Sequence, residues 1–150
     1  MQDQLLFDFV VVGAGSAGCV LAGNLSASGR HSVLLLEAGP DRNDFWINTP
    51  LGYGHSIFNA AVNWMYASEP EAGLGGRSIP VPRGKVVGGS SAINAMVYMR
   101  GTKADYDEWE RGGHPDWAWD RVLSSYKEIE NHCIRDAWHG KAGPLQVNSR

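Results

Sequence analysis

Three glycines and one acidic residue near the N-terminus have the types and the spacing that bind a dinucleotide. The apolar run Phe9–Val12 is followed by Gly13, Gly15 and Gly18, and Glu37 ends a second apolar run. The first two glycines allow a tight turn and a close backbone approach to a pyrophosphate, and the third lets a helix pack on the strand. The carboxylate is placed to accept hydrogen bonds from ribose hydroxyls, and it repels a 2′-phosphate. The pattern predicts an adenine dinucleotide and argues against NADP.

A strand, a helix and a second strand are needed to position these residues. We expect a fully buried parallel strand over 9–12, a helix that begins near Ser16 and ends at Ser28-Gly29, and a second strand over 32–36. The unpaired N–H groups at the start of that helix then face the phosphates. This α/β arrangement does not by itself distinguish NAD from FAD.

A second glycine-rich segment begins at Pro82. Gly88 and Gly89 predict a sharp turn, Ser90 is able to cap, and residues 91–98 are able to form a short helix whose N–H groups point at an anion or a polar ring edge. Two glycine turns, each followed by a predicted helix N-terminus, indicate a ligand with two polar ends.

Between the two motifs, residues 40–82 show little periodicity. A segment of this length without structure is unusual in a compact domain, so we expect it to face a ligand or another domain. It is predicted to contain a short helix over 57–62 and a strand over 64–68. Its aromatic side chains are interpreted as satellite core packing, with direct ligand contact as the alternative for each, and they are Phe45, Trp46, Tyr53, Phe58, Trp64 and Tyr66.

The remainder of the chain has helical patterns. Residues 102–105 form a capping box for a helix through Trp109 that Gly112-Gly113 stops, and Asp120 opens a second helix. Trp117 and Trp119, which precede that second helix, are interpreted as packing anchors.

Composition and charge exclude several classes of function. The 150 residues carry a net charge of −3, and no lysine or arginine cluster interleaves with aromatic residues, so nucleic acid is not an expected partner. No apolar run has the length of a membrane span, and Met1–Asp8 lacks the positive region of a secretory signal, so we expect a cytoplasmic protein. Cys19 is interpreted as a buried helix residue. Cys133 lies near His132 and His139 without the spacing of a metal site.

With both motifs in view, the chain resembles the GMC (glucose-methanol-choline) oxidoreductases, a family of flavoenzymes. The family signature is similar to Gly84-Lys-Val-Val-Gly88-Gly89-Ser90-Ser91-Ala-Ile-Asn94, followed by Tyr98, Gly101 and Asp107. Asn63-Trp-Met-Tyr and His139-Gly-Lys-Ala-Gly-Pro-Leu145 look like the choline-dehydrogenase-like and alcohol dehydrogenase branch. The resemblance selects FAD over NAD. It implies a Rossmann-like FAD-binding fold of the GMC type, incomplete in this chain and completed by a downstream or partner segment.

The resemblance also implies cofactor roles residue by residue. The loop from Gly13 to Gly18 would hold the FAD pyrophosphate, with Ser16 and Ala17 offering backbone N–H groups, and Glu37 would hold the adenosine ribose. A second set would lie against the flavin end, and it consists of Gly89, Ser90, Asn94, Ala95, Met96 and Val97. Some relatives carry a histidine in this segment that links covalently to the flavin. Positions 92–94 hold no histidine, so noncovalent FAD is expected. An alternative for Asn94 is a turn residue that bonds its own backbone.

One departure from the family is large. Family enzymes are several times longer, and their catalytic histidine lies near the far C-terminus. The histidines of this chain fall elsewhere, so we expect no catalytic residue and no metal ligand here, and we interpret residues 143–150 as the entry to a missing substrate domain. A parallel sheet needs covered faces and paired neighbours, so these 150 residues are expected to expose an apolar sheet edge.

The resemblance therefore implies the FAD-binding portion of a flavin-dependent alcohol oxidase or dehydrogenase, in which hydride passes from a CH–OH carbon to flavin N5. The acid/base group would come from a C-terminal fragment or downstream region, and the chain alone would be inactive. The expected substrate is a small alcohol, and oxygen or a quinone is compatible as acceptor. Two alternatives stay open, a non-catalytic nucleotide-binding or partner-binding module and a non-redox flavoprotein similar to hydroxynitrile lyase.

Overall fold

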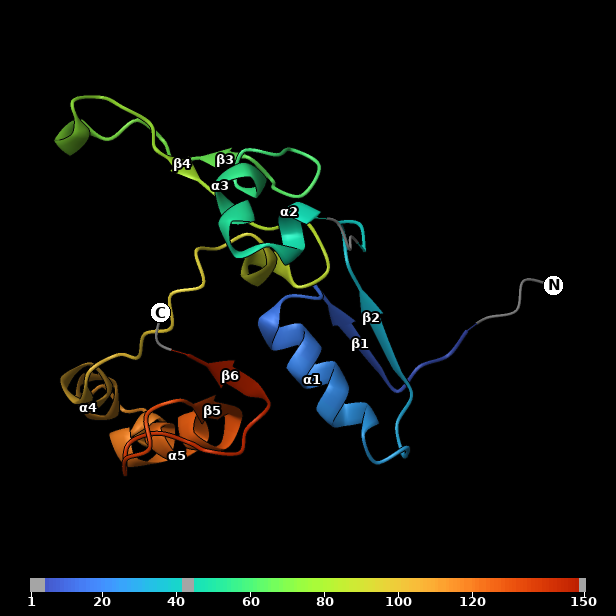
Figure 1. Ribbon diagram of the computed structural model, residues 1–150, viewed down its shortest axis with the longest axis vertical. Helices are drawn as coiled ribbons and strands as arrows, with labels where there is room; N and C mark the ends of the chain where they lie inside the picture. The colour runs from blue at the N-terminus through green and yellow to red at the C-terminus, as the bar shows by residue number, and fades with distance from the viewer. Residues whose placement is uncertain (1–4, 42–44, 149–150) are drawn as a thin grey trace. The chain divides into compact units, whose positions relative to one another are not determined.

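The computed structural model describes residues 5–41 and 45–148. It divides into two compact units, Met1–Val97 and Tyr98–Arg150 (Figure 1). The first part of the Met1–Asp8 segment and the last two residues of 143–150 lie outside the described residues. Within the described chain the longest helices have 11 residues, and no helix is long and apolar enough to cross a membrane.

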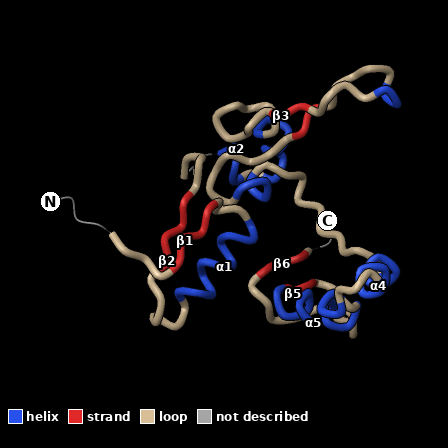
Figure 2. Tube along the Cα trace, turned by 180° about the vertical axis from the view of Figure 1, so that it is seen from behind, coloured by secondary structure: helices blue, strands red, loops and turns tan. Residues whose placement is uncertain are grey.

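The first unit opens with a strand, a helix and a parallel strand. β1 (Phe9–Val12) pairs with β2 (Val33–Leu36), Phe9 opposite Val33 and Val12 opposite Leu36. α1 (Ser16–Ser26) connects the strands and runs beside them (Figure 2). Gly29 follows α1 with a φ of 67°, a left-handed conformation that glycine adopts without strain. The predicted order of elements is confirmed, and β2 begins one residue later than expected.

The prediction that the first strand is fully buried is wrong for this chain. Val11 is 8% exposed, but Val10 is 56% and Val12 82% exposed. The reason is that β1 and β2 form a sheet of two strands among the described residues, so the apolar sheet surface expected of this piece is open. The prediction for Cys19 is also wrong, because its side chain is exposed on α1.

Residues 40–82 form short elements in place of the predicted ones. α2 (Phe45–Asn48), η1 (Pro50–Gly52) and α3 (Tyr53–Ser56) come first, and no helix occurs over 57–62. There Asn59 accepts a hydrogen bond from Ala61 N through its side chain (3.0 Å), which competes with helical pairing. The predicted strand over 64–68 shortens to β3 (Tyr66–Ala67), because Met65 has a φ of 57°.

β3 pairs antiparallel with β4 (Pro80–Val81), and η2 (Ala72–Leu74) lies in the hairpin between them. In the same unit, Val62, Val86 and Ile93 form the buried core cluster. The prediction that the aromatic side chains of 40–82 form a satellite core is wrong, because all six are exposed in this chain. Some of them stack on neighbouring rings, as in Trp46–His55 (ring centroids 4.6 Å) and Trp64–Tyr66 (5.9 Å).

The second unit is built from two helices and a parallel strand pair. α4 (Lys103–Arg111) begins at Thr102 with the predicted capping box and ends at Gly112, and Gly113 follows with a φ of 96°. η4 (Pro115–Trp117) leads into α5 (Trp119–Ile129), which begins one residue before Asp120. β5 (Glu130–His132) pairs with β6 (Leu145–Val147). Trp119 is half-buried and packs on Tyr106, as expected for a packing anchor, whereas Trp117 contacts the Trp109 ring edge-on but is 51% exposed.

A buried carboxylate ties the second unit together. Glu130 is fully buried, and its Oε1 accepts hydrogen bonds from Gly140 N (2.6 Å) and from the guanidinium of Arg100. Its Oε2 accepts from the Tyr98 hydroxyl (2.8 Å). Burial by itself raises the pKa of this carboxyl, but the three donors and the charge of Arg100 outweigh burial and lower the pKa to about 2. Glu130 is therefore ionised and paired in the folded unit.

Candidate nucleotide-binding site

The first glycine loop leaves β1 at the carboxyl end of the strand pair. Gly13 N donates to Leu36 O (2.7 Å), and Gly13 has a φ of 102° that favours glycine. A Cβ at Gly18 would collide with the carbonyl oxygen of Gly13, so the start of α1 lies directly against the loop. The structure thus contains the turn predicted at Gly13 and the close helix packing predicted at Gly18, and the approach of Gly15 to a pyrophosphate stays a prediction.

The N-terminus of α1 lies beside the second glycine motif, through the bridge between Gly15 and Gly88. Gly15 is the N-cap, and no side chain among the described residues caps this end. The first bond along the helix runs from Cys19 N to Gly15 O (2.9 Å), so the N–H groups of Ser16 and Ala17 precede the helical ladder. Such an end attracts an anion through its N–H groups and its dipole.

Glu37 joins the end of β2 to the glycine loop. Its Oε2 accepts a hydrogen bond from Ala14 N (2.8 Å), and its Oε1 accepts from Gly39 N (2.9 Å). A carboxylate has about four acceptor positions, so two remain for hydroxyl donors of a ligand. The sequence predicted a ligand role for this side chain but not its role in holding the loop.

The second glycine motif packs directly on the first. Gly88 has a φ of 95° and Gly89 a φ of 58°, which confirms the predicted turn. Gly88 N donates to Ala14 O (2.7 Å), and Gly15 and Gly88 form a parallel bridge. A Cβ at Gly89 would lie 2.8 Å from Gly15 Cα. The backbones of the two motifs therefore touch, and a side chain at Gly89 would prevent this contact.

The predicted helix over 91–98 is wrong. η3 (Gly89–Ala92) ends after a single turn, and the Oδ1 of Asn94 accepts a hydrogen bond from Met96 N (2.8 Å). This turn, with a φ of 56° at Met96, is the alternative that the sequence left open for Asn94. Ser90 does not cap a helix, because its Oγ accepts from Gly84 N (3.0 Å).

A cavity of about 1060 Å³ lies between the two motifs within the first unit. It brings together most of the predicted site residues, namely Gly13, Gly15, Ser16, Ala17, Gly18, Glu37, Gly89 and Ser90. Asn94, Ala95, Met96 and Val97 are not part of its described lining. Trp64, Arg83 and Gly84 line it without having been predicted. The volume, the helix N-terminus without a side-chain cap and the close glycine approaches fit an extended ligand with a diphosphate.

Comparisons with known proteins agree on one family. Residues 7–150 match the family described as GMC oxidoreductase. The oxygen-dependent choline dehydrogenase of Photobacterium profundum is 44% identical over 140 residues, which are 93% of this chain and 25% of that protein.

Two solved structures have the same fold over this length. Pyridoxine 4-oxidase from Mesorbium loti matches with a TM-score of 0.86 and 40% identity, over 93% of this chain and 28% of that one. An FAD-dependent oxidoreductase from Chaetomium thermophilum matches with a TM-score of 0.80 and 32% identity, over 95% of this chain and 26% of that one. The chain thus spans about a quarter of the length of these relatives. It belongs to the GMC oxidoreductase family.

Proposed function

We propose that the first unit binds FAD noncovalently, as the cofactor portion of an enzyme that oxidises a small alcohol at its CH–OH group. The observation that carries the proposal is the cavity at the carboxyl end of β1, where an uncapped helix N-terminus meets a second glycine turn. The similarity to a choline dehydrogenase, a pyridoxine oxidase and an FAD-dependent oxidoreductase supports it. Choline and pyridoxine both carry hydroxyl groups.

Each group of residues has a separate task in this proposal. The N–H groups of Ser16 and Ala17 bind the diphosphate, and Glu37 accepts the ribose hydroxyls on the acceptor positions that Ala14 and Gly39 leave open. Gly89 and Ser90, with residues 94–97, face the flavin end. FAD, when bound, supplies the hydride acceptor for the CH–OH carbon at flavin N5.

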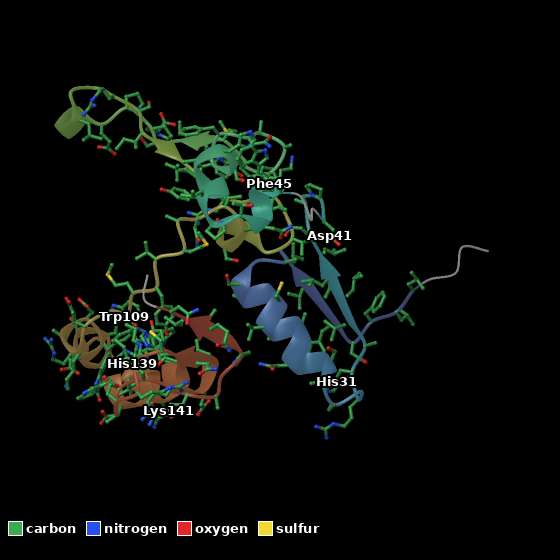
Figure 3. All side chains as sticks on the ribbon, in the orientation of Figure 1. His31, Asp41, Phe45, Trp109, His139 and Lys141 are labelled. Carbon is green, nitrogen blue, oxygen red and sulfur yellow. The ribbon has the colours of Figure 1, made fainter. Side chains whose placement is uncertain are left out.

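The group that removes the hydroxyl proton is proposed to lie outside this chain, in a C-terminal fragment or downstream region. None of the chain's histidines is part of the described cavity lining. His31 lies at the α1–β2 turn, at the opposite end of the strands from Gly13, and contacts the Phe9 ring (Figure 3). His55 stacks on Trp46. We therefore expect the 150 residues alone to bind FAD without turning over an alcohol.

The cofactor can be tested by visible absorption of the purified protein, before and after acid precipitation. We expect a flavin spectrum in the native protein and free FAD in the acid supernatant, because Ala92, Ile93 and Asn94 have no side chain able to form the covalent bond. A yellow pellet would contradict noncovalent attachment. A protein that neither carries FAD nor takes it up when added would overturn the proposed function.

A further inference from the structure

The cavity wall carries one positive side chain whose role the sequence did not predict. Among the described lining residues, Glu37 is the acidic residue and Arg83 the basic one. The carboxylate of Glu37 already holds two backbone donors. The guanidinium of Arg83 makes no hydrogen bond or ion pair within the described chain, so its donors are available to a ligand.

The backbone of Arg83 is fixed in place by the segment that precedes the hairpin. Its N–H donates to the Oδ1 of Asn63 (2.9 Å), and its carbonyl accepts from Trp64 N (2.9 Å). Asn63 is itself buried, and its Nδ2 donates to Ile57 O (2.5 Å). An arginine whose backbone is anchored in this way begins from a defined position at the cavity wall.

A short series of backbone contacts links Arg83 to the anion-binding helix end. The next residue, Gly84, packs so closely on Gly89 that a Cβ at Gly84 would collide with the Gly89 carbonyl. Gly89 in turn packs on Gly15, the N-cap of α1. Arg83, which is exposed, and the first residues of α1, Ser16 and Ala17, therefore line the same cavity, whose wall these glycine contacts hold together.

We propose that Arg83 is a specificity-determining residue that selects a diphosphate ligand, its guanidinium pairing with the diphosphate oxygens held by the N–H groups of Ser16 and Ala17. This inference rests on the proposed function and adds a charged contact to it. A guanidinium forms paired hydrogen bonds with phosphate oxygens that an ammonium does not match. The neighbouring Lys85 is not part of the described cavity lining, and its Nζ lies 4.8 Å from the centre of the Trp64 ring.

The test compares ADP with adenosine, which differ in the diphosphate alone, by titration calorimetry of the flavin-free protein. We expect Arg83→Gln to weaken ADP binding about 10-fold, the size of a lost charge-assisted hydrogen bond, and to leave adenosine binding unchanged. Arg83→Lys should retain part of the ADP affinity, because it keeps the charge without the paired geometry. Arg77→Gln is the matched control, because Arg77 lies in the β3–β4 hairpin and its Nε donates to Leu74 O.

The outcomes separate this inference from the proposed function. Equal ADP affinity in the wild type and Arg83→Gln, with FAD still bound, would overturn the role of Arg83 and leave the proposed function standing. An equal loss of ADP and adenosine affinity would overturn it as well, because a structural effect does not distinguish the two ligands. If Arg83→Gln fails to fold, Arg83→Lys decides. Full ADP affinity in Arg83→Lys would then overturn a paired guanidinium contact, because the lysine keeps the charge without that geometry. A wild-type protein that binds neither FAD nor ADP would instead remove the proposed function.

Discussion

At the scale of single residues, Glu37 combines two tasks that are usually considered separately. Its carboxylate bridges Ala14 and Gly39, so it sets the position of the glycine loop before any ligand arrives. The same oxygens are proposed to accept ribose hydroxyls. A ligand that binds here meets an acceptor whose rotamer is already fixed, which lowers the entropy lost on binding.

Replacing Glu37 by alanine should weaken FAD binding by about 1.5–3 kcal/mol, because hydrogen bonds to a charged acceptor are lost. Titration of flavin-free protein with FAD measures the change. Glu69→Ala is the control, because Glu69 is exposed and is not part of the described cavity lining. Unchanged affinity in Glu37→Ala would remove this side chain from the site.

The residue types and spacing of the first motif were enough to predict Gly13, Gly18 and Glu37, because each depends on a local turn or a strand end. Arg83 could not be found in this way. It reaches the cavity because Asn63, twenty residues earlier, holds its backbone, and no periodicity in the sequence records that hydrogen bond.

At the scale of elements, the packing of α1 on the β1 turn decides whether the helix end points at the ligand. Gly18 allows this packing, since a Cβ there would collide with the Gly13 carbonyl. Gly23 lies on the same helix, and a Cβ there would meet nothing within 4 Å. Replacement by alanine therefore creates a collision at Gly18 and none at Gly23, although both residues lie on the same helix.

Gly18→Ala should lower the free energy of unfolding by about 1–3 kcal/mol and reduce FAD affinity, because the helix must move away from the loop. Gly23→Ala should raise stability by about 0.5–1 kcal/mol, because alanine favours the helix and the site is open. Urea unfolding and FAD titration of both variants measure these effects. Equal stability of the two variants would contradict the packing described for Gly18.

The elements that the sequence predicted correctly have strong local signals. The capping box at Thr102 marks the start of α4, and the glycines after Arg111 mark its end. The valines predict β1, and the glycine loop marks its end. Two predicted helices failed for one reason. Asn59 and Asn94 each accept, through the side-chain oxygen, a hydrogen bond from the backbone N–H two residues later, and this local turn competes with a helix at both places.

At the scale of the whole molecule, the two units rely on different interactions. The first has an apolar cluster of Val62, Val86 and Ile93. The second places a charged residue, Glu130, where it is fully buried, with Arg100 and Tyr98 as side-chain partners. Removing one member of such a buried pair leaves the other charge without compensation.

Acid should therefore weaken the second unit. The pKa of Glu130 is lowered from 4.5 to about 2 in the folded unit, where pairing outweighs burial. A lowered carboxyl pKa adds stability that is fully present above pH 4.5 and is lost as the pH falls towards about 2. Hydrogen exchange of the β5 and β6 amides against pH measures this loss.

Glu130→Gln should be less stable at neutral pH and should show a smaller dependence on pH in this window, because the residue no longer titrates. An NMR titration of the wild-type Glu130 carboxyl measures the pKa directly, without a variant. A folded-state pKa near the ordinary value of 4.5 would contradict the pairing described for this residue.

The bridge between Gly15 and Gly88 closes a long loop of chain that contains the β3–β4 hairpin. The entropy of closing a loop rises with the logarithm of its length, and doubling the length costs only about 0.6 kcal/mol. Residues added at the hairpin tip, near η2, would therefore change the free energy of bringing the two glycine motifs together very little. We therefore expect the hairpin to tolerate insertions, while the backbone contacts at the base of the loop hold the cavity wall in place.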